Sequence, residues 1–195
     1  MIGLTIVPLA GAAPQPWRNG GGVTRELLAW PAPAAWTLRI SVAQIGCDGP
    51  FSAFADVERW FAVVHGAGVT LQFDGGCHTL TVGSAPLCFD GAAPPACTLT
   101  GGPTEDLNLM LRRQAGHGAM QCARPGVDWC SPAALRALYC SGPAQLQING
   151  RHVADLAAAA LVWHPYAAGQ TWRIHAANAT TLAWWMSFDA QPRRP

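Results

Sequence analysis

Two short stretches decide the fold of this chain: LQFDG at residues 71–75 and LQING at residues 146–150. Their offset is 146 − 71 = 75, and the same offset carries LNLMLRR (residues 107–113) onto LAWWMSF (residues 182–188) without a gap. Self-similarity at a fixed spacing is typical of a repeated structural unit. The chain is therefore predicted to contain two copies of one unit.

Each copy is predicted to be all-β. Short apolar runs such as VTLQF, CTLT, AQLQI and TWRI alternate with glycine, proline, aspartate and asparagine, at a spacing typical of a β-sandwich or barrel. The turns FDGG and INGR indicate hairpins, because glycine and asparagine tolerate a positive φ.

One segment gives conflicting signals. SPAALRAL (residues 131–138) has the serine and proline of a helix start, yet the offset overlays it on DVERWFAV (residues 56–63), which resembles a strand. Further along, QAGHG (residues 114–118) breaks the strand pattern. We place the domain boundary there, which predicts domains at residues 1–115 and 116–195.

The composition excludes several classes of function. Half of the 195 residues are hydrophobic and the formal net charge is +1, so a core is expected but neither a nucleic-acid nor a membrane partner. All twelve basic residues are arginine, which rules out a Schiff-base or P-loop lysine. Seven cysteines without a CxxC pair, together with the lack of a signal peptide, predict reduced thiols in a cytoplasmic protein.

Metal and nucleophile chemistry have no sequence support either. The six histidines form no compact pair, and only His65 lies where a metal-binding cupin would place its ligand cluster. The chain also lacks a GxSxG elbow and a phosphate-binding glycine loop. No metal and no cofactor are therefore expected.

Two predicted strands carry one apolar and one polar face. The polar faces of DLNLMLR (residues 106–112) and TLRIS (residues 37–41) hold Asp106, Asn108, Met110, Arg112, Thr37, Arg39 and Ser41. Such faces either meet solvent or line the mouth of a barrel. Aspartate and asparagine are disfavoured in mid-strand, which favours the second interpretation.

Three blocks together resemble the HutD/Ves family: PWRNGGGVTREL (residues 16–27), WTLRISVAQIGCDGPFSAF (residues 36–54) and GPTEDLNLMLRR (residues 102–113). The resemblance implies a bicupin, with two cupin-like jelly-roll barrels in one chain and without the metal-ligand set. It also implies an accessory role in bacterial histidine utilisation, such as sensing a pathway intermediate. Family members usually have lysine where this chain has Arg18, which keeps the charge but changes the donor geometry.

A ligand pocket is expected in the first barrel. Urocanate, formiminoglutamate and formylglutamate are the candidate ligands, and each carries a carboxylate that arginine can bind. We expect Arg39 and Arg112 to bind the carboxylate, and Asp106 to orient an arginine or to accept from a ligand nitrogen. The glycines would let the backbone approach the ligand and present its N–H groups. The predicted ligand-binding residues are Trp17, Arg18, Asn19, Gly20, Gly21, Arg39, Ser41, Asp106, Asn108 and Arg112.

Two other functions are consistent with the sequence. One is a metal-independent isomerase or hydrolase that uses Asp106, Glu26 or His65 for acid–base chemistry. The other is protein interaction through exposed strand faces. A homodimer is compatible with the sequence, and the expected partner is a small carboxylate metabolite.

Overall fold

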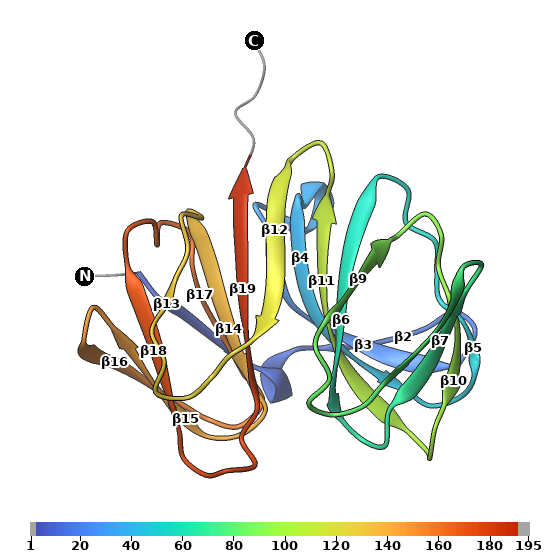
Figure 1. The fold of residues 1–195 in the computed structure, drawn as a ribbon. Coiled ribbons are helices and arrows are strands. Elements are labelled where there is room, and N and C mark those ends of the chain that lie inside the picture. Colours follow the sequence, from blue (N-terminus) through green and yellow to red (C-terminus); the bar gives the residue numbers. More distant parts are fainter. Residues whose placement is uncertain (1–2, 191–195) are drawn as a thin grey trace. The chain divides into compact units, whose positions relative to one another are not determined.

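The structure is a computed structural model that describes residues 3–190, so the ends of the predicted domains at residues 1–2 and 191–195 lie outside it. The chain forms two compact β units (Figure 1). One unit is Ala12–Gly116, and the other combines the chain up to Gly11 with the chain from His117 onwards. Within the described residues there is no α-helix, and no helix that could cross a membrane.

The first unit contains two antiparallel sheets. The order of the six-stranded sheet is β2 (Pro14–Pro16), β3 (Gly22–Trp30), β4 (Leu38–Ile45), β11 (Thr104–Arg112), β6 (Val57–His65) and β9 (Leu87–Asp90). The order of the four-stranded sheet is β5 (Gly49–Pro50), β10 (Ala96–Leu99), β7 (Val69–Phe73) and β8 (Gly76–Leu80). A short 3₁₀ turn, η2 (Pro33–Ala35), connects β3 to β4.

The second unit has the same plan. The order of its five-stranded sheet is β1 (Thr5–Pro8), β17 (Ala160–His164), β14 (Leu135–Cys140), β19 (Ala183–Ala190) and β12 (Gly116–Cys122). The order of its four-stranded sheet is β13 (Trp129–Cys130), β18 (Thr171–Ala176), β15 (Ala144–Ile148) and β16 (Arg151–Leu156). The 3₁₀ turn η1 (Leu9–Gly11) follows β1.

Each unit closes around its own apolar core, to which both of its sheets contribute. In the first unit, Phe61 and Val63 of β6 pack with Val69 and Leu71 of β7. In the second, the core includes Trp172 and Trp185, and Trp185 stacks on Trp129 with ring centroids 4.9 Å apart. Two facing sheets around one core make each unit a closed sandwich or barrel.

The predicted repeat is confirmed by the two central hairpins. β7 and β15 begin at offset 144 − 69 = 75, and β8 and β16 begin at 151 − 76 = 75. Each hairpin has a two-residue connection. In the second hairpin Asn149 and Gly150 have φ of 51° and 73°, which is the backbone that the INGR turn predicts.

The helix signal at residues 131–138 is wrong. β14 begins inside this segment at Leu135, and all six of its residues are buried. It pairs with β17 on one side and β19 on the other, so long-range pairing overrides the local capping signal. The overlay on residues 56–63, which contain the start of β6, gave the right answer.

The N-terminal segment lies in a different unit from the one predicted. The observed boundary, between Gly116 and His117, is one residue from the predicted one, but residues up to Gly11 belong with the second unit. β1 pairs antiparallel with β17, so that Thr5 faces Trp163. The local sequence of β1 indicates a strand but carries no information about which distant strand it pairs with.

All seven cysteines are free in the structure. Five are exposed, and Cys97 and Cys140 are buried. Burial raises the pKa of each buried thiol to about 12, so both remain protonated at neutral pH. Their environment is that of small core residues.

Candidate functional site

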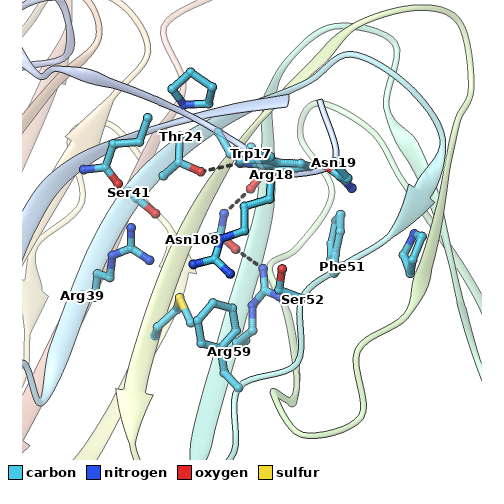
Figure 2. A pocket seen from close by; sticks show the side chains of 17 residues that line it. Trp17, Arg18, Asn19, Thr24, Arg39, Ser41, Phe51, Ser52, Arg59 and Asn108 are labelled. Atoms are coloured by element: carbon cyan, nitrogen blue, oxygen red, sulfur yellow. Dashed lines mark hydrogen bonds between the residues drawn. The ribbon is translucent and has the colours of Figure 1, made fainter. Parts of the chain in front are cut away.

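The first barrel contains a cavity of about 540 Å³, within the size range of small-molecule sites (Figure 2). Strands β3, β4, β6 and β11 form its walls, and the segments around Trp17 and Phe51 complete it. The residues lining it are Gln15, Pro16, Trp17, Arg18, Asn19, Thr24, Arg39, Ser41, Ala43, Pro50, Phe51, Ser52, Phe54, Arg59, Asp106, Asn108 and Met110.

The structure brings together seven of the ten predicted ligand-binding residues. The seven that line the cavity are Trp17, Arg18, Asn19, Arg39, Ser41, Asp106 and Asn108. Gly20, Gly21 and Arg112 are not part of its lining.

The glycine-rich segment is a tight turn at the cavity, and its N–H groups are used within the turn. The Gly20 N–H donates to the Trp17 carbonyl at 3.0 Å, and the Gly21 N–H donates to Asn19 Oδ1 at 3.0 Å. A Cβ on Gly22 would lie 2.4 Å from the Gln44 carbonyl oxygen, so close packing against β4 requires glycine there. The glycines therefore shape the turn, and the N–H groups of Gly20 and Gly21, which were predicted to face a ligand, bond within it.

This turn holds Trp17 and Arg18 at the cavity. The indole N–H of Trp17 donates to Thr24 Oγ1 at 2.8 Å, which fixes the ring against β3. Arg18 is exposed, and its side chain points towards Asn108 and Arg59 (Figure 2). The turn thus supplies one aromatic wall and one cation.

Arg112 lies outside the cavity. It is the last residue of β11, and its guanidinium lies 4.8 Å from the centroid of the Trp36 ring. Strand alternation places it on the same face as Asp106 and Asn108, but the cavity ends before the strand does. The structure therefore does not place Arg112 in the cavity, although the sequence predicts it as a ligand-binding residue.

Arg39 lines the cavity but already has a partner. Its Nε donates to Glu26 Oε2 on β3 at 2.6 Å, and both side chains are partly buried. Arg39 is therefore held in place by an ion pair before any ligand arrives.

Arg59 is the site residue that the sequence prediction missed. It lies on β6, only 7% exposed, with the rings of Phe51, Phe54 and Phe89 at 5.2, 5.8 and 5.1 Å from its guanidinium carbon. Its Nη2 donates to Asn108 Oδ1 at 2.8 Å, while its buried Nε has no hydrogen-bond partner among the described residues. Burial lowers the pKa of Arg59 to about 10, so it stays cationic at neutral pH.

The sequence did contain a signal for this arginine. In VERWFAV, alternation places Arg59 on the same face as Val57, Phe61 and Val63, and that face is buried. A single charged residue on an otherwise apolar strand face indicates a buried cation.

Asp106 completes the floor of the cavity. It is 1% exposed and accepts a hydrogen bond from Nδ2 of Asn108, which is 5% exposed. Burial raises the pKa of Asp106 to about 7, opposed by the positive charge of Arg59 and by the bond from Asn108. Asp106, Asn108 and Arg59 thus form a continuous buried chain of hydrogen bonds.

The donor set of the cavity does not fit a metal ion. Its charged side chains are three arginines and one carboxylate, and no histidine, cysteine or glutamate lines it. Across residues 3–190, no three His, Cys, Asp or Glu side chains are grouped so that they could hold a metal. A cavity rich in cations instead favours an anion.

The fold and the cavity together define the class. The chain is a bicupin, and a similar arrangement is found in oxalate decarboxylase from Bacillus subtilis. That structure matches 95% of this chain and 77% of its own, with a TM-score of 0.62 at 11% identity. At this identity the likeness shows the fold alone.

The particular family follows from sequence. The HutD family model matches residues 10–184, so the chain belongs to the HutD family. Protein Ves of Cronobacter sakazakii is 35% identical over 98 residues, which cover 50% of this chain and 54% of that protein. An uncharacterized 21.2 kDa protein in the hutC 3' region of Pseudomonas putida is 32% identical over 108 residues, covering 54% and 57% respectively. The chain thus spans about half the length of the curated relatives that it matches.

Several solved structures match nearly the whole chain, one of them at more than 25% identity. It is a conserved protein of unknown function from Pseudomonas aeruginosa, which is 26% identical with a TM-score of 0.86 and matches 95% of this chain and 98% of its own.

Proposed function

We propose that this protein binds a small carboxylate metabolite in the cavity of its first barrel. The observation that carries the proposal is Arg59, a buried cation at the cavity with an unpaired N–H and with a neutral amide as its direct partner. A buried charge without a directly opposed counter-charge is costly, and an anion in the cavity would remove that cost.

The remaining lining suits a small planar or unsaturated acid. Trp17, Phe51 and Phe54 offer aromatic surface, and Arg18 supplies a second cation, which forms no ion pair within residues 3–190. A charged hydrogen bond contributes roughly 1.5–3 kcal/mol, so two such contacts and one stacked ring support micromolar binding, near about −8 kcal/mol.

Family membership supports an accessory or regulatory role in histidine utilisation, since one relative is described by its place in a hutC region. Urocanate, formiminoglutamate and formylglutamate are the candidate ligands, and the protein would act in the cytoplasm without a metal. A thermal-shift panel with these three acids, followed by calorimetry, tests the proposal, because a ligand of the native state raises the melting temperature. If none of the three, nor any simple carboxylate, stabilises the protein at millimolar concentration, the binding proposal is wrong.

One observation favours the alternative, a metal-independent isomerase or hydrolase. Asp106 lines the cavity with a pKa near neutrality, as a general acid–base residue requires. The other two candidates are placed less well: Glu26 is paired with Arg39, and His65, exposed at the end of β6, is not part of the lining. Product analysis after incubation with each acid separates the functions: turnover means an enzyme, and saturable binding without turnover means a sensor.

A further inference from the structure

We propose that Asp106 is a positioning residue, which acts through Asn108 to fix the guanidinium of Arg59 for a bound carboxylate. This inference rests on the proposed function, because it concerns how the same cavity prepares its cation. The three residues lie on two neighbouring strands, Asp106 and Asn108 on β11 and Arg59 on β6.

The chemistry of the carboxylate determines the orientation of the Asn108 amide. An ionised Asp106 can only accept hydrogen bonds, so the atom of Asn108 that faces it must be the donor Nδ2. The carbonyl Oδ1 of the same amide then points the other way, where it accepts from Arg59 Nη2 at 2.8 Å. Both ends of the amide are buried, so neither bond can be replaced by bulk water.

The Asn108 amide lets Asp106 position the guanidinium of Arg59 without pairing with its charge. In a direct ion pair, the Asp106 carboxylate would bind the guanidinium and compete with an incoming anion. With Asn108 between them, Asp106 holds the guanidinium in place but leaves direct contact with its charge to the ligand. The rings of Phe51 and Phe54 pack against the guanidinium and restrict its motion further.

Two substitutions separate positioning from simple charge repulsion. Asp106→Asn removes the charge but keeps an oxygen that can accept from Asn108. Asp106→Leu removes the charge and the acceptor together and keeps the branched shape, with two larger methyl groups in place of the oxygens. If Asp106 only repels anions, both variants bind a carboxylate more tightly than the wild type. If it positions Arg59, Asp106→Asn binds at least as tightly as the wild type, whereas Asp106→Leu binds about tenfold more weakly or worse.

The pH dependence of anion affinity is a second measurement, and it would not change if Asp106 had only a structural role. The ionisable groups that act on or sense Asp106 are Arg59 from β6, Glu105 from its own strand and Cys97 from β10, and Arg39 from β4 acts on Arg59. A protonated Asp106 still offers its carbonyl oxygen to Asn108 but no longer repels the ligand. Affinity for an anion should therefore rise several-fold as the pH falls from about 8 to 6. This pH dependence should be absent in Asp106→Asn.

The experiment is calorimetric titration of the whole protein and the two variants with formate, which stays ionised over this range of pH. In parallel, the Arg59 Nε–Hε signal is followed by NMR in the absence of formate. Tighter or equal formate binding by Asp106→Leu, with an unchanged Arg59 signal, would overturn the positioning role. If neither formate nor any of the three candidate acids binds the wild type, the proposed function fails, but the NMR signal still decides whether Asp106 fixes Arg59. Should Asp106→Leu not fold, Asn108→Leu breaks the same chain from its middle, and binding that matches or exceeds the wild type would again overturn the proposal.

Discussion

The two barrels each contain a buried arginine on corresponding strands, and they use it differently. Arg59 on β6 faces Phe89 on β9, and Arg136 on β14 faces His164 on β17, although the two arginines are 136 − 59 = 77 residues apart and not at the repeat offset of 75. Arg136 is fully buried and donates to the backbone carbonyls of Gln170 and Ser131. Its guanidinium also lies 5.4 Å from the centre of the Trp129 ring.

The difference between the two arginines is the kind of acceptor that each one meets. Backbone carbonyls belong to the fold, so Arg136 ties two loops of the second barrel together and has a structural role. Arg59 meets a side-chain amide and lies beside a cavity, whereas the buried Nε has no hydrogen-bond partner within the described residues in either arginine. A buried arginine thus has a structural role in one copy, and we propose that it binds the ligand in the other.

The largest effect expected from this comparison is on stability. Arg136→Met leaves two buried carbonyls without their donor, and should lower the free energy of unfolding by about 3–5 kcal/mol. Urea denaturation measures the loss. The matched control is Arg173→Met in the same barrel, whose guanidinium is exposed and pairs with Asp128, and which should change stability by about 0.5 kcal/mol or less. Equal stability of the two variants would remove the distinction between a structural and a ligand-binding arginine.

The second effect is an opposite pH response of the two barrels. Burial raises the pKa of Asp106 above its ordinary value of 3.8 to about 7, so the folded first barrel holds a proton that the unfolded chain releases. Stability should therefore fall as the pH rises through this window, by about 2–4 kcal/mol, and Asp106→Asn should remove that dependence.

His164 in the second barrel has the reverse sign. Burial lowers its pKa below the ordinary 6.5, so the unfolded chain takes up a proton that the folded chain resists. Stability from this residue is present above pH 6.5 and is lost as the pH falls below it. His164→Asn keeps an acceptor for the Tyr166 N–H and should flatten the acid side of the profile. Unfolding curves from pH 5 to about pH 8.5 test both residues, and variants with profiles parallel to the wild type would contradict the assignment.

The smallest effect concerns Arg39. It lines the cavity but, like Arg136, already has a partner within the fold, which is Glu26. Glu26→Gln weakens the ion pair, whose side chains are 24% and 17% exposed for Glu26 and Arg39. The cost in stability should be about 1 kcal/mol or less, and the affinity for a carboxylate should change by less than about threefold. A tenfold gain in affinity would show that Glu26 holds back a second ligand-binding arginine.

Sequence reasoning succeeded where a local pattern has one structural meaning. The LQFDG and LQING hairpins fixed the repeat, and the mid-strand Asp106 and Asn108 indicated a functional face that does line a cavity. It failed where the outcome depends on distant partners. β1 joins the second barrel through pairing with β17, and the segment at residues 131–138 becomes a strand because two neighbours pair with it.

The sequence misplaced two arginines relative to the cavity, Arg112 and Arg59, for the same reason. Arg112 has the right alternation but lies beyond the end of the cavity, where it stacks on Trp36. Arg59 lies on a strand face that is otherwise apolar, and its partner Asn108 is 49 residues away in sequence. How far a cavity extends along a strand depends on the closed barrel. The alternation of side chains along one strand does not predict it.

The central claim, that Arg59 anchors a carboxylate, is tested most directly by calorimetric titration of Arg59→Met with the acid that stabilises the wild type most. Loss of the buried guanidinium should weaken binding by about 2–4 kcal/mol, or roughly 30- to 1,000-fold. Arg59→Lys keeps a positive charge but loses the planar guanidinium, so its affinity should lie between those of the wild type and Arg59→Met. Arg112→Met, the same change outside the cavity, should bind as the wild type does. Wild-type affinity in a folded Arg59→Met protein, or a loss shared equally by Arg112→Met, would contradict the account.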